Sequence, residues 1–303
     1  MSVLDAYTSL LSVEGAAVRR DERLSRHTSY RIGGPADLLV SVRSYGALQR
    51  AIEILGREAV PWVILGKGSN ILASDEGYRG CVILLEGEFS RMSVNAEERT
   101  ITAGAGILLS RVVNEAMKAG LSGLECCVGI PGTFGGALSM DAGTRREWIG
   151  NLVQDLVVLR PGEGMHRYAG SDIEWGYRGT TLPTSEIILE ATLALKAGER
   201  DAITRDMDER LRSRRESQPL SKPSCGSVFR NPPERSVGLL IQSCGLAGSQ
   251  QGGAEISSQH CNFILNRGDA TASDVLTLIQ RAHDAVLQRY DIDLTCEVKL
   301  LGF

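Results

Sequence analysis

The spacing of apolar and polar residues predicts a chain in which short strands alternate with helices. Alternating or fully apolar runs bounded by turn residues predict strands at 36–42, 62–65, 81–85, 100–103, 152–159, 187–195, 262–265 and 294–300. Apolar residues at helical spacing predict helices at 45–55, 109–117, 200–216 and 236–243, and a last helix after Thr271. A short helix and a polar lead-in are expected within residues 1–26. This order of elements indicates an α/β (α+β) fold.

Two of the predicted helices carry a recognisable boundary. Gly120 follows the helix at 109–117, and glycine commonly ends a helix. Thr271 and Asp274 form the capping-box pattern that opens a helix. The apolar face expected for this last helix consists of Val275, Leu278, Ile279, Ala282 and Val286.

A polar break at 196–199 is the main domain boundary that the sequence predicts, and we expect domains at 1–80, 81–198 and 199–303. The helix that follows the break is highly charged, and two interpretations of it are open. It is either an anion-binding face or a solvated linker with mixed ion pairs. The second interpretation is favoured because acidic and basic residues are mixed along the helix.

The composition excludes several classes of protein. The chain has 303 residues, of which 43% are hydrophobic, so it can bury a sizeable core. Its 33 basic and 37 acidic residues give a net charge of −4, which does not favour non-specific binding of nucleic acids. We find no signal peptide and no apolar run near the roughly 20 residues that span a bilayer. Seven cysteines without a C-x-x-C pair predict reduced thiols in a cytosol, and four scattered histidines do not suggest a metal site.

The stretch from 128 to 143, VGIPGTFGGALSMDAG, is rich in glycine and almost free of charge. Pro131 fixes the angle at which the chain enters it. Such a run can direct several backbone amides at an anion, or it can be a tight bend inside a core. It lacks the G-x-G-x-x-G pattern of a Rossmann dinucleotide site. Four glycines are expected to turn the chain at positive φ and to let amides approach a ligand: Gly129, Gly132, Gly135 and Gly136.

A second loop, LGKGSNILASD at 65–75, follows the strand predicted at 62–65. Its turn, Gly66-Lys67-Gly68-Ser69-Asn70, offers backbone amides, a hydroxyl and a side-chain amide. These groups together suit a pyrophosphate. Two such loops in one chain favour phosphate binding over a purely structural role.

These two loops belong to a series of motifs that covers nearly the whole chain. The motifs are HTSYRIGGPAD (27–37), LGKGSNILASD (65–75), GIPGTFGGA (129–137), YRGT (177–180), CGSVFRNP (225–232), GGAEIS (252–257), HCNFILN (260–266) and CEVKLLG (296–302). In content and order they resemble the UDP-N-acetylenolpyruvoylglucosamine reductases, in the branch with a reduced substrate-domain loop. The resemblance implies a vanillyl-alcohol-oxidase/PCMH-type FAD-binding domain in two subdomains (1–80 and 81–198). A smaller C-terminal α/β substrate-binding domain (199–303) would follow.

The resemblance implies that the two glycine-rich loops hold FAD and that NADPH is the hydride donor. We expect the FAD to be non-covalent, because no histidine stands beside either loop in the sequence. The residues expected to bind the cofactor are Gly66, Lys67, Gly68, Ser69, Asn70, Gly129, Ile130, Pro131, Gly132, Thr133, Gly135, Gly136 and Gly143.

Three catalytic residues follow from the resemblance, and the sequence alone separates them widely. Ser227, preceded by Gly226, would otherwise be interpreted as an ordinary turn serine, but it matches the family's proton donor. Arg178 matches an active-site arginine, and a planar guanidinium suits a substrate carboxylate. Glu297, in the predicted closing strand, matches the glutamate that helps to stabilise an enol-like intermediate. Cys225 is a competing nucleophile, expected to be inert because no histidine lies near it in sequence.

The implied reaction has two halves. NADPH gives a hydride to FAD, and the reduced flavin gives a hydride to the methylene carbon of UDP-N-acetylglucosamine enolpyruvate. Protonation by Ser227 then yields UDP-N-acetylmuramate, a peptidoglycan precursor made in the cytoplasm. The expected partner is this small UDP-sugar enolpyruvyl ether, with no nucleic acid and no membrane. We expect the chain to be a monomer.

The chain departs from the family pattern directly after the second loop. It reads SMDAGTRR from residue 139, where the family has a tyrosine, an asparagine and then alanine-tyrosine-glycine. Asp141 adds a carboxylate near a predicted phosphate site, which is unfavourable unless it faces away or meets an arginine. Arg145 and Arg146 could supply that partner. Two further departures lie downstream: Arg230 in place of a lysine and Gln242 in place of a glutamate.

Two other functions remain open from the sequence. A sugar or lactone oxidase has the same flavin fold, and many such enzymes attach FAD covalently through histidine or cysteine. The motifs GGAEIS and HCNFILN favour the reductase instead. The other alternative is a flavin-binding protein without turnover, which the presence of Ser227, Arg178 and Glu297 argues against. The colour of the purified protein, and its bleaching by NADPH without air, would distinguish these functions.

Overall fold

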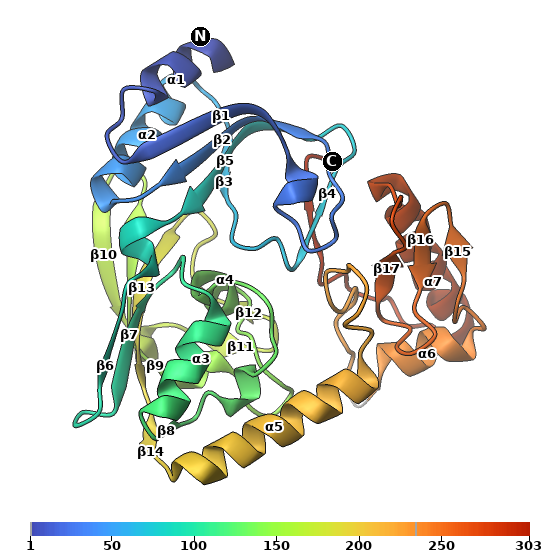
Figure 1. Cartoon of the computed structure of the whole chain (residues 1–303). Helices are drawn as coiled ribbons and strands as arrows, with labels where there is room; N and C mark the ends of the chain where they lie inside the picture. The colour runs from blue at the N-terminus through green and yellow to red at the C-terminus, as the bar shows by residue number, and fades with distance from the viewer. Residues whose placement is uncertain (1, 234) are drawn as a thin grey trace. The chain divides into compact units, whose positions relative to one another are not determined.

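Figure 1 shows the computed structural model of the chain, which describes residues 2–233 and 235–303. The chain divides into two compact units, and each unit collects segments that are far apart in the sequence. Unit 1 comprises Met1–Arg20, Leu38–Gly66 and Gly80–Arg214, and unit 2 comprises Asp21–Asp37, Lys67–Arg79 and Arg215–Phe303. Each unit therefore depends on contacts that local sequence patterns do not specify.

Unit 1 contains a five-stranded antiparallel sheet with the order β10-β9-β13-β7-β6. The alternating runs predicted at 152–159 and 187–195 form β9 and β13, which pair with each other from Ile187 opposite Leu159 onward. This prediction is therefore confirmed. The strands are β6 (Met92–Asn95), β7 (Thr100–Gly104), β9 (Val153–Arg160), β10 (Gly164–Ala169) and β13 (Ile187–Ala194).

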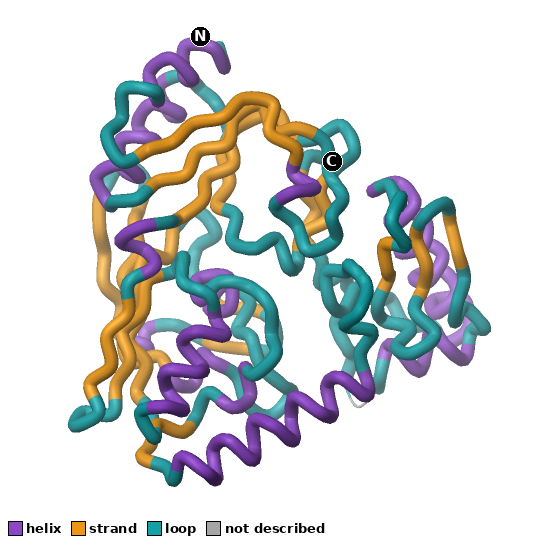
Figure 2. Tube along the Cα trace, in the orientation of Figure 1, coloured by secondary structure: helices purple, strands orange, loops and turns teal. Residues whose placement is uncertain are grey.

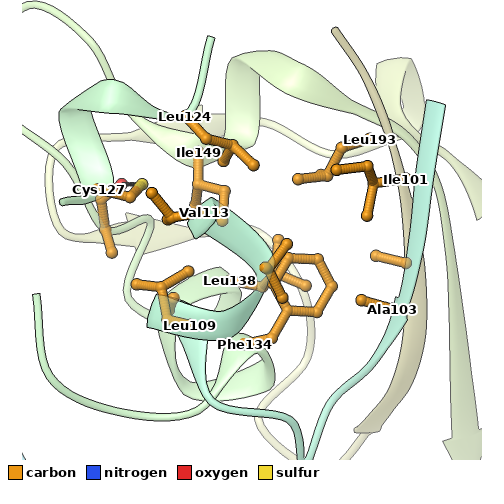
Figure 3. Packing of buried hydrophobic residues seen from close by; sticks show 14 of the residues in the cluster. Ile101, Ala103, Leu109, Val113, Leu124, Cys127, Phe134, Leu138, Ile149 and Leu193 are labelled. Carbon is orange, nitrogen blue, oxygen red and sulfur yellow. Dashed lines mark hydrogen bonds between the residues drawn. The ribbon is translucent and has the colours of Figure 1, made fainter. Parts of the chain in front are cut away.

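Two helices, α3 (Leu109–Lys118) and α4 (Phe134–Ser139), lie against one face of this sheet (Figure 1). Figure 3 shows Phe134 and Leu138 of α4 facing Ile101 of β7, and all three side chains are buried. Removing this apolar surface from water holds the helices on the sheet. Gly120 ends α3 at a φ of 67°, as the sequence predicts.

A second sheet has the order β1-β2-β5-β3, and the helices α1 and α2 pack against it. Leu10 and Leu48 of these helices share one buried cluster with Val40 and Ile83 of the sheet. Strand β1 has no counterpart among the expected strands, because its sequence, AAVRRDER, is largely charged. Hydrogen bonding to β2, rather than burial of side chains, makes this segment a strand. The elements are α1 (Val3–Leu10), β1 (Ala16–Arg23), β2 (Pro35–Val42), α2 (Tyr45–Arg57), β3 (Trp62–Ile64) and β5 (Tyr78–Leu85).

Unit 2 is built from α6, α7 and a three-stranded antiparallel sheet with the order β15-β16-β17. The predicted apolar face of α7 is confirmed: Val275, Leu278, Ala282 and Val286 are buried, and Ile279 packs beside them. The capping box is also present at the start of this helix. The elements are α6 (Val237–Ser243), β15 (Gln250–Gln251), β16 (Ala254–Ile256), β17 (Ile264–Asn266) and α7 (Ala272–Tyr290).

The strand expected at 294–300 is wrong over most of its length. Only β18 (Lys299–Leu301) is a strand, and it pairs in parallel with β4 (Ile71–Ala73). Upstream, Cys296 forms an isolated bridge with Phe229 instead. The chain thus changes its hydrogen-bonding partner before residue 299, so no continuous ladder forms and Glu297 lies outside any strand.

Helix α5 (Arg200–Ser217), drawn in purple in Figure 2, is the charged helix that the sequence predicts. Ile203 and Met207 are its buried residues. Arg210 pairs with Asp206 and with Glu147, each at 2.8 Å, which agrees with mixed ion pairs along this part of the helix. The remaining elements are short: β8 (Leu121–Ser122), β11 (Trp175–Gly176), β12 (Gly179–Thr180), β14 (Lys196–Ala197) and 3-10 turns at Leu24–Arg26, Gly87–Ser90, Glu125–Cys127, Ile149–Leu152 and Gly170–Asp172.

Two further features bear on the expectations from composition. The seven cysteines are all free thiols. Within residues 2–233 and 235–303, none of the helices combines the length and the apolar character needed to cross a membrane.

The capping box of α7 generates a stability prediction. The Thr271 hydroxyl accepts the Asp274 amide at 3.1 Å, and the Asp274 carboxylate accepts the Thr271 amide at 3.0 Å. Thr271→Ala leaves a helix amide unpaired and should lower the free energy of unfolding by about 1 kcal/mol. Urea denaturation measures this loss. Thr277→Ala is the matched control, because Thr277 is exposed within the same helix and alanine has the higher helix propensity. Equal losses in both variants would contradict the assigned cap.

Candidate functional site

The first glycine-rich loop follows β3 and precedes β4. Gly68 has a φ of 58°, and a Cβ atom there would lie 2.5 Å from the carbonyl oxygen of His27. The Gly68 carbonyl oxygen accepts the Ser29 amide at 3.1 Å, which ties the loop to the segment around Ser29. Only glycine fits at position 68 without strain, because φ is positive there and a Cβ atom would meet the His27 backbone.

The second glycine-rich stretch begins after the 3-10 turn at Glu125–Cys127. Gly129 has a φ of 72° and Gly132 a φ of 132°, so both glycines turn the chain as expected. Thr133 then caps α4, and its hydroxyl accepts the Gly136 amide at 3.3 Å. The stretch thus combines an open turn with the start of a buried helix.

The expectation of positive φ at Gly135 and Gly136 is wrong, because both residues lie in the first turn of α4. Gly135 is required for a different reason. A Cβ atom on it would lie 2.6 Å from the Cβ of Ala105, whose carbonyl accepts the Gly135 amide at 2.9 Å. Close packing of helix on backbone, rather than a turn, decides this position.

The two loops meet inside unit 1, at Gly66 and Thr133. A Cβ atom on Gly66 would lie 2.6 Å from the Thr133 hydroxyl. Backbone amides that the fold leaves without a partner suit a phosphate. In each loop three backbone amides donate to no other described residue: Gly66, Lys67 and Gly68 in the first, and Gly129, Gly132 and Thr133 in the second.

Arg178 lies in unit 1, in the turn between β11 and β12. It has a φ of 64°, an unfavourable conformation for a residue with a side chain. Its guanidinium lies 5.2 Å from the centre of the Tyr177 ring and donates to the Gly143 carbonyl at 3.3 Å. The strained turn therefore places the Arg178 side chain at the end of the second glycine-rich stretch.

Asp141 lies two residues before Gly143, at the same end of the glycine-rich stretch. The arginine that acts on it differs from the one expected. The arginine whose charge acts on Asp141 is Arg178, rather than Arg145 or Arg146. The Asp141 carboxylate is buried and accepts the Gly150 amide at 2.8 Å. Burial raises the pKa of Asp141 to about 6, although the Gly150 hydrogen bond and Arg178 both oppose this rise.

Helix α5 contributes one residue that neither interpretation of the charged helix singled out. The Arg214 side chain packs against Gly129, where an added Cβ atom would lie 3.1 Å from the Arg214 Cδ. Burial and the charge of Arg178 lower the pKa of Arg214. A second arginine therefore lies near the glycine-rich stretch. Its signal in the sequence was hidden by the many other charges of the helix.

Ser227 and Glu297 both belong to unit 2, and backbone hydrogen bonds hold their segments together. Gly226 has a φ of 81°, which turns the chain directly before Ser227. The Glu297 amide donates to the Val228 carbonyl at 2.7 Å. Asn70 of the first loop joins them, because its side-chain amide donates to the Glu297 carbonyl at 3.0 Å.

Asn262 is a supporting residue that the sequence analysis missed. Its side chain is buried, accepts the Phe229 amide at 3.0 Å and donates to the Phe229 carbonyl at 2.8 Å. Its own carbonyl accepts the Val228 amide at 2.8 Å. Asn262 therefore fixes the segment that follows Ser227. The only signal in the sequence is its place in the motif HCNFILN.

Cys225 and His27 bear on the alternatives considered from sequence. Cys225 is buried, and burial raises the pKa of its thiol, so the expectation of an inert thiol agrees with its surroundings. His27 is distant from Gly68 in sequence, yet its backbone lies against that glycine in the fold. Its Nε2 lies 3.0 Å from the Glu22 carboxylate. A histidine therefore stands beside the first loop, with its ring already engaged.

The packing of Gly135 generates a prediction about the second loop. Gly135→Ala forces α4 away from Ala105 at a contact of 2.6 Å, and overpacking of this kind costs about 1–3 kcal/mol. Because the displaced turn carries Thr133, the variant should be purified with clearly less flavin per chain. The ratio of flavin to protein absorbance measures this loss. Gly46→Ala is the matched control, since Gly46 lies in the first turn of α2, where an added Cβ atom meets no other atom within 4 Å. Equal flavin contents would show that the contact does not shape the loop.

Comparisons with known proteins agree with this geometry. Residues 36–163 match the model of an FAD binding domain, and residues 218–301 match the C-terminal domain of UDP-N-acetylenolpyruvoylglucosamine reductase. The chain is 44% identical to UDP-N-acetylenolpyruvoylglucosamine reductase 2 of Symbiobacterium thermophilum, over 94% of this chain and 92% of that protein. It is 41% identical to the reductase of Heliobacterium modesticaldum, over 93% of this chain and 90% of that protein.

A solved structure gives the same result for the fold. The crystal structure of UDP-N-acetylenolpyruvylglucosamine reductase (MurB) from Thermus caldophilus matches with a TM-score of 0.83 and 38% identity. The match covers 94% of this chain and 99% of that chain. The fold is therefore the expected α/β flavoenzyme fold, with an FAD-binding domain and a smaller C-terminal domain. The chain belongs to the UDP-N-acetylenolpyruvoylglucosamine reductase (MurB) family.

Proposed function

We propose that this protein reduces UDP-N-acetylglucosamine enolpyruvate to UDP-N-acetylmuramate in the cytoplasm, with NADPH as hydride donor and non-covalent FAD. The names of the relatives at 44% and 41% identity support this activity. The observation that supports it most within the chain is the 2.7 Å hydrogen bond from the Glu297 amide to the Val228 carbonyl. This bond holds Val228, the residue after Ser227, against Glu297, so the two proposed catalytic residues of unit 2 lie on neighbouring segments.

FAD fits the residues that are present in the two loops. Both loops have glycines at positive φ and backbone amides that make no hydrogen bond to another described residue. A cofactor phosphate can accept hydrogen bonds from such amides. The residues proposed to bind FAD are those expected from the sequence, in 66–70, 129–133, 135, 136 and 143.

Each proposed catalytic residue has a separate task. The chemistry supplied by bound FAD is hydride transfer from NADPH to the methylene carbon of the enolpyruvyl ether. Arg178 grips the substrate carboxylate with two hydrogen bonds and stabilises the charge that develops on it. The Ser227 hydroxyl donates a proton to the carbon that carries the carboxylate. Glu297 helps to stabilise the enol-like intermediate between these two steps.

We propose the same domain roles as the sequence predicts. Residues 1–80 and 81–198 form the two FAD-binding subdomains, and 199–303 bind the UDP-sugar. We also propose that the protein acts as a monomer.

Non-covalent attachment of FAD can be tested directly. The His27 ring lies 3.0 Å from Glu22 and is therefore engaged in another contact. Acid precipitation of the holoenzyme should release all yellow colour into the supernatant. Flavin that stays on the pellet would favour the oxidase alternative, and loss of that retained flavin in His27→Ala would identify the attachment residue.

The assignment of Ser227 predicts an effect on only one half-reaction. Ser227→Ala should leave FAD content and the reduction of FAD by NADPH nearly unchanged. It should slow anaerobic reoxidation by UDP-N-acetylglucosamine enolpyruvate about 10²- to 10⁴-fold, the usual effect of losing a general acid. Stopped-flow flavin absorbance measures both half-reactions on one preparation.

Ser224→Ala is the matched control for this experiment. Ser224 lies in the same segment, where its backbone carbonyl accepts the Ser29 hydroxyl at 2.7 Å. Substitution of its side chain should change neither half-reaction. If Ser227→Ala slows the NADPH step and spares the substrate step, the assignment of the proton donor is wrong.

A further inference from the structure

Asp141 is a buried carboxylate that the proposed chemistry does not use. It lies two residues after the end of α4, has a φ of 42° and is 1% exposed. One of its oxygens, Oδ1, accepts the Gly150 amide at 2.8 Å. The other, Oδ2, is buried and has no hydrogen-bond partner among the described residues. A buried carboxylate with one unsatisfied oxygen is costly when it is ionised.

The groups around Asp141 come from three other elements. Arg178, in the turn between β11 and β12, acts on it by charge and is anchored to the Gly143 carbonyl. Cys127, in the 3-10 turn before the glycine-rich stretch, donates to the Ala142 carbonyl at 3.8 Å and interacts with the charge of Asp141. Arg214 of α5 interacts with both Arg178 and Cys127. Asp141 is thus the acidic member of a cluster with two arginines.

We propose that Asp141 is a positioning residue that takes up a proton when the carboxylate of the substrate binds to Arg178. This inference rests on the proposed function, because it takes Arg178 as the group that binds that carboxylate. An ionised Asp141 competes for the same guanidinium, and a second anion beside it makes its ionisation still less favourable. Protonation of Asp141 leaves the charge of Arg178 to the substrate.

Reciprocity between the two binding events follows from this arrangement. If substrate binding favours the proton on Asp141, protonation must favour substrate binding by the same factor. Burial raises the pKa of Asp141 to about 6, so the group changes its charge within the working range of an enzyme. The asparagine that the family pattern has at this position cannot titrate. The coupling is therefore specific to chains with aspartate here.

A measurement without substrate tests the titration of Asp141. A group with a raised folded pKa stabilises the protein fully below its unfolded value, near 3.8, and loses that contribution as pH rises through 6. Asp141→Asn keeps an acceptor for the Gly150 amide and does not ionise. Relative to wild type, the variant holoenzyme should gain stability from pH 4 to pH 8, by up to about 100-fold in the unfolding equilibrium constant. Equal pH profiles in urea would overturn the buried titration.

Steady-state kinetics test the coupling to substrate. The KM of the wild type for UDP-N-acetylglucosamine enolpyruvate should rise nearly tenfold, by about a factor of eight, between pH 5 and pH 8, as one pKa unit of coupling implies. In Asp141→Asn the KM should change less than twofold over the same pH range, and kcat should stay close to the wild-type value at both ends of that range. Glu147→Gln is the control, because this carboxylate lies in the same loop but is exposed and pairs with Arg210. It should keep the wild-type KM profile.

Calorimetry on the wild type alone keeps the inference testable if a variant fails to fold. Binding of the substrate to the holoenzyme near pH 7, in two buffers of different ionisation enthalpy, should show net proton uptake. A wild type that turns over the substrate with a pH-independent KM and no proton uptake overturns the role of Asp141 alone. A wild type without any turnover overturns the proposed function instead.

Discussion

The backbone of Gly66 passes so close to Thr133 that a Cβ atom at residue 66 would lie 2.6 Å from the threonine hydroxyl. Thr133 is also the residue that caps α4. The backbone at Gly66 and the start of α4 therefore depend on one close contact between two segments. Gly135 extends the same constraint to the sheet, because it holds α4 against Ala105. Glycine is required at these points by the space available rather than by flexibility.

The second glycine-rich stretch also ends in a cluster of charges. Arg178 reaches it from a strained turn, Arg214 from α5, and Asp141 lies buried between the end of α4 and Gly150. Two arginines close together are stabilised by a carboxylate, and the same carboxylate weakens their attraction for an incoming anion. The cluster therefore links the charge state of the protein to the binding of an anionic ligand. In the family pattern, an asparagine would leave the two arginines without this control.

In unit 2, the candidate catalytic segments are held by side-chain amides instead of a continuous strand. Asn262 makes two hydrogen bonds to Phe229, and Asn70 binds the Glu297 carbonyl. An amide side chain can donate and accept at once, so it can replace the hydrogen bonds that a neighbouring strand would supply. This explains how Glu297 stays fixed although the strand expected around it is absent. It also makes residues outside the catalytic set essential for the geometry.

The sequence by itself determined the elements whose signals are local. Several features follow from patterns within a few residues: the alternating runs of β9 and β13, the apolar face of α3, the capping box at Thr271 and the positive φ of Gly129. The resemblance of its motifs also pointed to the family, which the comparisons confirm. Such features depend on periodicity and on backbone conformation, which a short segment carries itself.

Only the tertiary structure decided which distant groups meet. Four features each depend on a group far along the chain: the helical φ of Gly135, the loss of the strand at Glu297, the charge of Arg178 acting on Asp141, and the approach of Arg214 to Gly129. The strand β1 belongs to this group, since its charged sequence becomes a strand only by pairing with β2. Local patterns fix what a segment can form, whereas packing and hydrogen bonding between remote segments select one partner among many of similar chemistry.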